Sequence, residues 1–489
     1  MSDRPAIFWF RRDLRLADNP ALAAAVAAAA SGHGPLLPLY VWEPRERRRW
    51  APGAAARWWL WHSLTALDGE LRARGSRLAV LEGDPAARVP ELAAVAGAHA
   101  VYWAAGLEPE EAADDAAVAA ALRAAGISAI VVPQANLLFD PAALRTKAGR
   151  PYTVFTPFWR TCLARPRPEL PLPAPRELPA APAASLAAGP DADAVAALAR
   201  LRDKAVRQWA SGFAGVWTPG EAGAQERLAR FVSGGLFGYA GERDRPAVDG
   251  TSRLSPHLHW GELSGRQVWH AVAGGLAEAG LELEAAVTPP DRDAAQAPGP
   301  GASAGAYLRQ LGWREFGHHL LAAFPELPER PLSRRFEGFP WRRDPDALDA
   351  WRRGRTGVAF VDAGMRELWG TGWMHNRARL VTGSFLVKDL LLPWTLGEDW
   401  FWDTLVDADL ADNALGWQWV AGCGADGAPY FRILNPETQA RRYDADGAYR
   451  RRWAGETSDA PAEPVVEHRA ARARALAAYD VMRESGRPS

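Results

Sequence analysis

The chain has 489 residues, a formal net charge of −1 and 48% hydrophobic residues, which is more sequence than one hydrophobic core normally supports. No apolar run is long enough for a transmembrane helix, the N-terminus lacks a secretory pattern, and two cysteines, Cys162 and Cys423, are too few for a disulfide framework or a four-cysteine cluster. We therefore expect a cytoplasmic, monomeric protein of at least two domains, without a metal site.

Residues 1–132 alternate short apolar runs with Ala-rich segments that are long enough for crossover helices. The apolar runs are the predicted strands: Ala6–Phe10, Leu36–Trp42, Arg77–Leu81, Ala98–Trp103 and Ser128–Val132. This alternation predicts an α/β domain with a doubly wound, parallel, five-stranded sheet. Asp18 or Asn19 is a suitable N-cap for the first helix, and Pro20 fits its first turn.

Residues 133–200 are predicted to be an interdomain linker, because Arg165–Pro190 is rich in Pro, Ala and Arg. From 201 to 489 the pattern is helical, with apolar residues at three- and four-residue spacing, and predicts an all-α domain. The predicted helices are Val206–Phe213, Gln225–Ser233, Ala304–Phe324, Asp346–Arg353, Val361–Trp369, Ala378–Leu392, Trp400–Val406 and an amphipathic one at Pro464–Met482. Gly275–Gly305 is predicted to be a loop insertion.

Several short segments of the helical half combine residues that suit ligand binding. Thr251–Ser264 begins with hydroxyl side chains and Arg253 at a predicted helix start, which suits a phosphate. Gln310, Trp313 and Arg314 share one helix face. Each segment also has a purely structural interpretation. The first can be an ordinary capped helix, and the second can be a core tryptophan beside a solvated arginine.

Residues 364–432 are unusually rich in indole rings. They contain Trp369, Trp373, Trp394, Trp400, Trp402, Trp417 and Trp419. Leu and Ile fill a core without an N–H that needs a partner, so this many indoles favour stacking or electron transfer. Asp407 and Asp409 lie in this poorly solvated setting and need partners, for which Arg379 is the natural candidate. The Gly422–Gly427 match to G-x-G-x-x-G follows no strand, so we reject a dinucleotide fingerprint there and predict a turn.

The opening A-I-F-W-F-R-R-D-L-R-L-A-D-N, together with the segments above, closely resembles the photolyase/cryptochrome family, in particular its class I cyclobutane pyrimidine dimer photolyases. The resemblance covers nearly the whole chain and implies FAD bound in the helical domain. The residues that match the family's flavin site are Tyr239, Arg243, Thr251, Ser252, Arg253, Leu254, Ser255, Tyr307, Arg314, Asn376, Arg379, Asp407, Asp409 and Asn413. The match pairs Arg379 with Asp407 over the flavin ring and places Asn413 at flavin N5.

The resemblance also implies roles outside the flavin site. Trp417, Trp394 and Trp341 match the family's proximal, middle and distal electron-transfer tryptophans. The residues that match the pocket for a flipped pyrimidine pair are Gln310, Trp313, Asn376, Arg377, Leu380 and Trp419. Arg342 and Arg343, in an Arg-rich segment, are the candidates for contact with the DNA backbone.

These matches predict a deoxyribodipyrimidine photo-lyase, which uses light and reduced FAD to split cyclobutane pyrimidine dimers in UV-damaged DNA. Asn413 and Trp419 favour repair, and Leu380 disfavours (6-4) photolyase activity, which needs a His at that position. Gln310 departs from the usual Glu and supports the alternative, a cryptochrome-like photoreceptor without repair activity. Two alternatives stay open for the N-terminal domain. It binds a folate or deazaflavin antenna, or it is empty and has only a structural role. Glu108 matches an antenna residue, whereas Trp103 is followed by Ala104 and Ala105 instead of the family's Asn and Arg.

Overall fold

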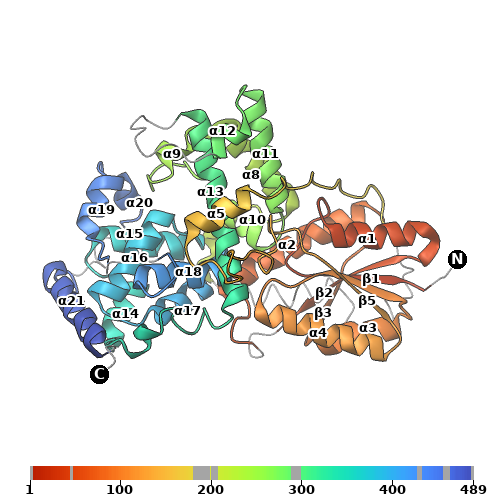
Figure 1. Cartoon of the computed structure of the whole chain (residues 1–489), viewed down its shortest axis with the longest axis horizontal. Coiled ribbons are helices and arrows are strands. Elements are labelled where there is room, and N and C mark those ends of the chain that lie inside the picture. The colour runs from red at the N-terminus through yellow and green to blue at the C-terminus, as the bar shows by residue number, and fades with distance from the viewer. Residues whose placement is uncertain are drawn as a thin grey trace.

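The structure is a computed structural model, in which a sheet-containing N-terminal part lies beside a larger helical part (Figure 1). The residues that it describes are 4–43, 48–179, 199, 208–287, 299–426, 432–454 and 463–485. None of the helices within these ranges is long and apolar enough to cross a membrane.

Five parallel strands form one sheet in the order β3-β2-β1-β4-β5. They are β1 (Ala6–Phe10), β2 (Leu36–Trp42), β3 (Ala79–Glu82), β4 (Ala100–Ala104) and β5 (Ser128–Val132). The central strand β1 pairs Ala6 with Leu36 on one side and with Ala100 on the other. The predicted fold class is confirmed, and only β3 and β4 begin later than predicted.

Helices cover both faces of this sheet because the side chains of β1 alternate between two apolar clusters. Phe8 and Phe10 pack with α1 (Pro20–Ala28) and α2 (Ala54–Ala73), whereas Ile7 and Trp9 pack with α3 (Pro85–Val95) and α4 (Pro109–Ala124). A π-helical turn, η1 (Ala29–His33), continues α1. The N-cap of α1 is Asn19, which accepts a hydrogen bond from Leu22 N, and Pro20 opens the helix as predicted.

The segment predicted to be a linker contains an unpredicted helix, α5 (Phe155–Leu163). Phe155 and Phe158 contact Phe316 of α13 with ring centroids 5.8 and 5.1 Å apart, so α5 belongs to the helical core. Residues 165–179 have no helix or strand and are mostly exposed, which agrees with the extended connection predicted there. The predicted domain division at 132 and 200 stays a proposal; β5 ends at Val132.

The helical half begins with a 3-10 helix, η3 (Gln208–Gly215), and the first residues of the helix predicted here, from Val206, lie outside the described residues. The helices that follow are α8 (Glu221–Arg230), α9 (Tyr239–Glu242), α10 (Ser255–His259), α11 (Gly265–Glu278), α12 (Leu283–Val287), α13 (Pro300–Ala323), α14 (Pro345–Arg352), α15 (Ala359–Thr371), α16 (Asn376–Ser384), α17 (Trp394–Thr404), α18 (Leu410–Ala421), α19 (Pro436–Tyr443), α20 (Ala448–Arg452) and α21 (His468–Ser485). Three shorter turns are η4 (Phe231–Gly235), η5 (Arg334–Gly338) and η6 (Phe385–Asp389).

The predicted loop insertion at Gly275–Gly305 is wrong at both of its described ends. Helix α11 continues to Glu278, α12 follows, and α13 begins at Pro300. Pro300 lies inside the predicted loop. Proline also fits the first turn of a helix, because the N–H that it lacks would have no partner within the helix there. Helix α17 also begins at Trp394, six residues before the predicted start, directly after Pro393.

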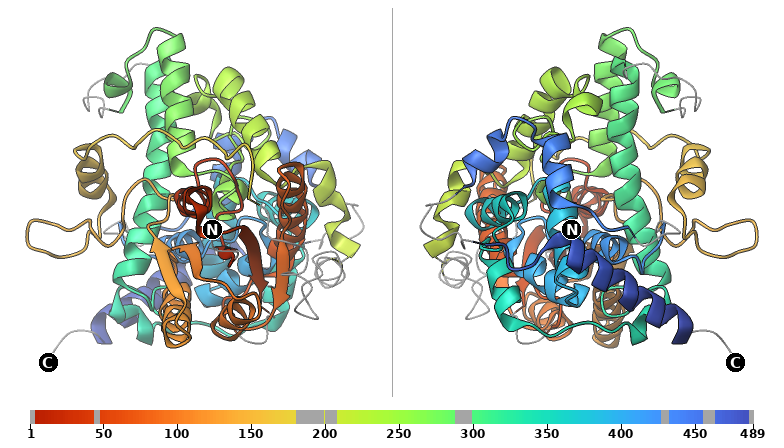
Figure 2. Two further views of the ribbon diagram at one scale, coloured as in Figure 1. Left: turned by 90° about the vertical axis from the view of Figure 1, so that its right-hand side faces the viewer. Right: turned by 90° about the vertical axis from the view of Figure 1, so that its left-hand side faces the viewer.

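The C-terminal helix α21 crosses the outer face of the helical half (Figure 2), at the end of the molecule opposite the sheet (Figure 1). His468 Nδ1 lies 2.5 Å from Asp389 Oδ1, and Arg474 donates to the backbone oxygen of Asp389 at 2.5 Å. The tail therefore packs on the body of the protein as an amphipathic helix, as predicted, although it begins at His468 instead of Pro464.

Candidate functional site

A cavity opens in the helical half and is lined by α9, α10, α13, α16, the start of α18 and the segments that join them. It has about 1250 Å³ of space that protein atoms do not fill, part of it open to solvent. The residues of the predicted flavin and substrate sites that line it are Tyr239, Arg243, Thr251, Ser252, Arg253, Leu254, Ser255, Tyr307, Gln310, Trp313, Arg314, Asn376, Arg379, Asp407 and Asp409. Side chains from segments about 170 residues apart in sequence therefore meet around one space.

Hydroxyl and guanidinium groups line one side of the cavity. Thr251, Ser252 and Ser255 lie on the segment that leads into α10, and Arg253 between them has a left-handed backbone with a φ of 49°. Such a backbone is uncommon for a residue with a side chain and is typical of functional sites. The guanidinium of Arg253 lies over the Trp373 ring at 4.9 Å, so the arginine is held beside the cavity.

The predicted ion pair between Arg379 and Asp407 is present. Arg379 Nη2 donates to both carboxylate oxygens of Asp407, at 3.0 and 2.7 Å, and Ser255 Oγ donates to Asp407 Oδ2 at 2.6 Å. Asp407 is buried, so these three bonds replace the water that its charge would otherwise need. The pair joins α16 to the segment that leads into α18.

Asp409 is the N-cap of α18 and the centre of a buried cluster. Its Oδ1 accepts hydrogen bonds from the backbone N–H groups of Ala411 and Asp412, and its Oδ2 lies 3.3 Å from His259 Nδ1 and 3.4 Å from His318 Nε2. Burial alone would raise the pKa of Asp409, but His318 and His259 together hold it well below its usual value. Burial lowers the pKa of His259, whereas Asp409 raises that of His318 against its burial, so of the two histidines the charged form is favoured at His318.

Helix α13 supplies the polar and aromatic residues of another wall. Arg314 donates to the backbone oxygens of Asn136, at 2.7 Å, and Leu258, at 3.1 Å, so the segment after β5 holds it in place. Trp313 stacks on Phe155 of α5 with ring centroids 3.8 Å apart and planes inclined by 7°. Gln310 donates to the backbone oxygen of Ala306 at 3.3 Å.

Four residues of the predicted flavin and substrate sites do not line this cavity. Arg377 forms an ion pair with Asp244 at 2.6 Å and lies over the Tyr443 ring. Leu380 and Trp419 are half-buried and pack against the helical core. Asn413 donates through Nδ2 to the backbone oxygen of Glu398 at 3.1 Å, which turns the amide toward α17.

The three predicted electron-transfer tryptophans differ in exposure. Trp394 and Trp417 are buried, whereas Trp341 is half-buried and contacts Phe339 with ring centroids 4.3 Å apart. The indole N–H of Trp417 has no hydrogen-bond partner among the described residues. The predicted DNA-backbone residues Arg342 and Arg343 follow directly and are exposed, with Arg342 lying 3.4 Å from Asp344.

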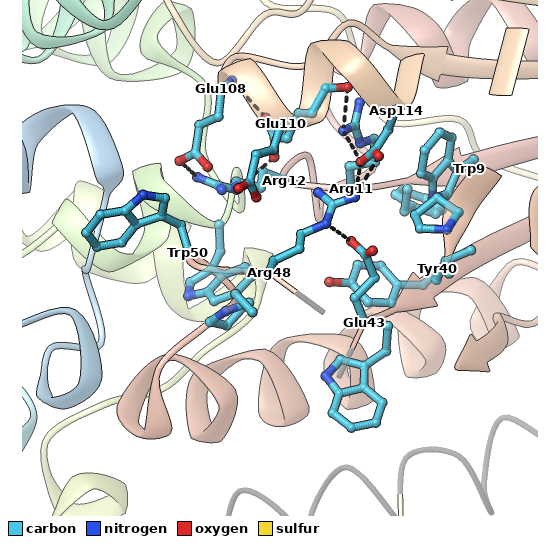
Figure 3. Close-up of a pocket in the computed structure, with 18 residues that line it drawn as sticks. Trp9, Arg11, Arg12, Tyr40, Glu43, Arg48, Trp50, Glu108, Glu110 and Asp114 are labelled. Carbon is cyan, nitrogen blue, oxygen red and sulfur yellow. Dashed lines mark hydrogen bonds and ion pairs between the residues drawn. The ribbon is translucent and has the colours of Figure 1, made fainter. Parts of the chain in front are cut away.

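A second pocket, at the carboxyl end of β1 and β2, contains alternating charges between aromatic rings (Figure 3). Arg48 pairs with Glu43 at 3.0 Å and with Asp114 at 2.6 Å, and Arg12 pairs with Glu108. Burial raises the pKa of both Glu43 and Glu108 to about 7, against the lowering effect of these arginines. The aromatic residues that line this pocket are Trp9, Phe10, Tyr40, Trp42, Trp50 and Trp260.

Sequence reasoning missed several residues of the first cavity: Leu258, His259, Leu311, Trp373, Met374 and Asp412. A signal existed for Asp412, because a carboxylate three residues after an N-cap aspartate lies in the first turn of the helix, on the side of the cap. No signal existed for Phe155, which stacks on Trp313 from a segment predicted to be a linker.

Two family models match the chain. One, described as DNA photolyase, covers residues 6–177, and the other, described as the FAD binding domain of DNA photolyase, covers residues 307–486. The second model begins at Tyr307, on the cavity, and ends at the last turn of α21. The chain thus carries an FAD-binding domain.

Individual proteins resemble the chain over almost its whole length. The deoxyribodipyrimidine photo-lyase of Agrobacterium fabrum is 40% identical, over 98% of this chain and 98% of that protein. Cryptochrome-1 of Arabidopsis thaliana is 38% identical, over 94% of this chain and 64% of the plant protein. A solved structure of a bacterial class III photolyase from Agrobacterium tumefaciens is 39% identical, covers 99% of this chain and 98% of its own, and has a TM-score of 0.86. The predicted resemblance to class I is not confirmed, since this neighbour is described as class III.

Proposed function

The chain belongs to the photolyase/cryptochrome family, and on that premise we propose that it is a light-driven repair enzyme that uses FAD to split cyclobutane pyrimidine dimers in UV-damaged DNA. The observation that supports this proposal is that one cavity is lined both by residues of the predicted flavin site and by residues of the predicted substrate site. Gln310 and Trp313 line the same space as Arg379 and Asp407, so a dimer bound there lies beside the cofactor.

The donor set of the cavity fits FAD. The hydroxyl groups of Thr251, Ser252 and Ser255, with the guanidinium of Arg253, suit the negative charges of a pyrophosphate. Arg379, held by Asp407, and Arg314, held by two backbone oxygens, present fixed N–H groups for the polar edge of a flavin ring. The remaining proposed cofactor residues are Tyr239, Arg243, Leu254, Tyr307, Asn376, Asp409 and Asn413.

When bound, FAD supplies the chemistry, which is an electron lent to the dimer under blue light and returned after the ring has opened. The protein positions the substrate. Trp313, stiffened by its stack on Phe155, offers a flat surface to a flipped pyrimidine pair, and Gln310 offers a hydrogen bond. We assign Asn376, Arg377, Leu380 and Trp419 to the rim of this pocket.

Two further parts of the proposal concern electrons and DNA. Trp417, Trp394 and Trp341 lead from buried to half-buried positions and suit a relay that brings electrons from the surface to the flavin. Arg342 and Arg343 are exposed and suit contact with the phosphates beside a lesion.

We propose that the second pocket holds an antenna chromophore. Its tryptophan and tyrosine rings suit a flat heterocycle, and Glu43 and Glu108 suit the N–H groups that a pterin and a deazaflavin share. Trp260 lines this pocket and His259 lines the flavin cavity, with ring centroids 4.9 Å apart, so the two sites adjoin. Reconstitution with either compound, followed by a FAD-fluorescence excitation spectrum, identifies which one transfers energy.

The second candidate function is a blue-light photoreceptor that does not repair DNA. Gln310 favours it, because the amide lacks the negative charge of the glutamate that dimer-repairing relatives carry in the matching position. The likeness to Cryptochrome-1 of Arabidopsis thaliana agrees with it as well.

One experiment separates the two functions. The FAD-loaded protein is chemically reduced, mixed with an oligonucleotide that contains one thymine dimer, and illuminated with blue light. We expect restored thymines in the light and none in the dark. A protein that binds FAD but leaves the dimer intact at every protein excess contradicts repair and supports the photoreceptor.

A further inference from the structure

Asp412 is the residue of the first turn of α18 whose carboxyl faces the flavin cavity. Its side chain is open to the cavity, whereas that of the neighbouring Asn413 is turned toward Glu398. The carboxyl also lies against α13, because a Cβ added to Gly317 would be only 2.8 Å from Asp412 Oδ1. The carboxyl of Asp412 thus has the backbone of α13 on one side and the cavity on the other side.

The other two carboxylates of the cavity have partners of their own. Asp407 is held by Arg379 of α16 and by Ser255, and Asp409 is held by His318 of α13 and His259 of α10. Within the part of the chain that the structure describes, the side chain of Asp412 forms neither a hydrogen bond nor an ion pair.

The charges around Asp412 come from two elements, the entry to α18 and helix α13. Asp409 and Asp407 precede it on the entry to α18 and repel a negative charge, whereas His318 and Arg314 on α13 attract one. His259 and Arg379 face Asp409 and Asp407 rather than Asp412. Although Asp412 is exposed to the cavity, the protein atoms around its carboxyl exclude part of the water, and this desolvation together with Asp409 raises the pKa of Asp412 to about 6. An acid placed in this way changes its charge near neutral pH, in the space where the flavin binds.

We propose that Asp412 binds a proton when the bound flavin is reduced, and that it thereby adds to the pH dependence that the flavin's own proton gives to the reduction potential. This inference rests on the proposed FAD site. Two electrons from a chemical reductant and one proton from solvent convert FAD to a reduced flavin with one negative charge. That charge raises the pKa of a nearby carboxylate, which then takes a second proton from solvent.

The sign of the effect follows from the two charge states of Asp412. At a pH well below the pKa, the carboxyl is neutral before and after reduction and leaves the potential unchanged. As the pH rises through the pKa, the oxidised protein carries a carboxylate that opposes the new charge, so the potential falls by more than the flavin's own proton uptake causes. Asparagine has nearly the same shape and no charge, so the variant Asp412→Asn lacks this fall.

The test measures the reduction potential of FAD in the full-length protein and in Asp412→Asn, across the pH range around that pKa. We expect the two potentials to agree at the lowest pH and to separate as the pH rises, with the natural protein lower. The expected separation is a tenfold change in the reduction equilibrium, which is about 30 mV for a two-electron couple. Potentials that coincide, or that differ by the same amount at every pH, overturn the inference.

A matched control removes the same charge outside the cavity. Asp399 on α17 is exposed and pairs with Arg49 at 2.8 Å, so Asp399→Asn should follow the natural protein at every pH. If Asp399→Asn separates in the same way as Asp412→Asn, long-range charge explains the effect and the inference is wrong.

Two further measurements keep this inference distinct from the proposed function. In the flavin-free protein, the infrared band of protonated carboxyl groups should lose one component that titrates near neutral pH in Asp412→Asn, whereas the components of Glu43 and Glu108 remain in both proteins. Binding of oxidised FAD in the dark should be similar in both proteins, because the oxidised flavin ring is uncharged. A protein that does not bind FAD contradicts the proposed function, whereas normal binding with coincident potentials contradicts only the role of Asp412.

Discussion

The amide of Gln310 illustrates how one polar group adjusts the substrate side of the cavity. Its Nε2 donates to the backbone oxygen of Ala306, which leaves Oε1 as the group that a substrate meets. A hydrogen bond to a neutral amide is weaker than one to a carboxylate, by a difference of about 1 kcal/mol. A glutamine at this position should therefore weaken dimer binding without preventing it.

We predict that Gln310→Glu binds a thymine dimer more tightly, by roughly tenfold or less, and repairs it faster at low substrate concentration. The measurement compares the affinity for dimer-containing and undamaged oligonucleotides, with the light-driven repair rate beside it. Gln310→Ala is the control and should bind more weakly than the natural protein. Equal affinity in all three proteins would show that this side chain does not touch the dimer.

At the scale of the elements, the tryptophans of the proposed relay lie on different parts of the helical half. Trp417 belongs to α18, Trp394 is the first residue of α17, and Trp341 lies between η5 and α14. Each is held by its own element, with Trp417 in contact with Phe401 of α17 at 4.9 Å between ring centroids. A conservative change in one member should interrupt electron transfer without unfolding the site.

We predict that Trp394→Phe blocks the photoreduction of oxidised FAD but leaves repair by the chemically reduced enzyme intact. Phenylalanine fills most of the space but is much harder to oxidise than tryptophan, whereas repair moves an electron directly between flavin and dimer. Absorbance under blue light with an external reductant measures the first reaction, and the oligonucleotide assay measures the second. Normal photoreduction in the variant means that electrons take another route.

The helices α19 and α20 carry exposed arginines close to the proposed substrate rim. Arg442 lies over the Tyr443 ring at 5.2 Å, and Arg377 lies over the same ring at 4.6 Å. Arg334, in the Arg-rich segment before Trp341, is different, because Glu326 and Glu337 hold it at 2.6 and 2.9 Å. A paired arginine has less to offer to a phosphate than one without an acidic partner.

We predict that Arg442→Ala weakens binding to damaged and undamaged DNA alike and lowers the salt dependence of binding by about one phosphate contact. Arg334→Ala is the matched control and should bind DNA like the natural protein. Titrations at several salt concentrations give both slopes. If the salt dependence of DNA binding is unchanged in Arg442→Ala, or if Arg334→Ala loses as much affinity for DNA, α19 does not contact DNA.

At the scale of the whole molecule, the cavity connects the two halves of the chain. Arg314 of α13 donates to Asn136, which follows the sheet, and Asn136 in turn accepts from Arg15 Nη1 at 2.6 Å. Glu315 accepts hydrogen bonds from the backbone of Leu138 and Phe139. A ligand that orders the cavity therefore also stabilises the contact between the sheet and the helices.

We predict that the protein binds FAD noncovalently and that removal of the FAD lowers the melting temperature. A ligand at one hundred times its Kd stabilises the folded state by about 2.7 kcal/mol, because it binds the folded state alone. Thermal unfolding of the FAD-loaded and FAD-free protein at several FAD concentrations measures this effect. Melting temperatures that do not depend on FAD would contradict the proposed site.

Short-range patterns were sufficient to predict the architecture. Apolar runs of strand length between Ala-rich segments predicted the parallel sheet, and Asp18 or Asn19 before Pro20 predicted the start of α1, because both features depend on neighbours in sequence. The sequence also indicated most of the cavity's lining through its resemblance to a known family. The errors lie where proline and glycine are compatible both with a loop and with the end of a helix. Pro300, for example, begins α13 instead of extending a loop.

The tertiary structure alone decided which side chains meet and which charges are neutralised. The Phe155 ring under Trp313, the histidines on Asp409 and the orientation of Asn413 all depend on elements far apart in the chain. Asp412 is the clearest case, because its spacing from Asp409 indicates a place in the first turn of α18 but does not indicate that its carboxyl lacks a partner. Only the packing of α18 against α13 leaves one carboxyl paired and the next open to the cavity, since partners and burial are properties of the folded chain.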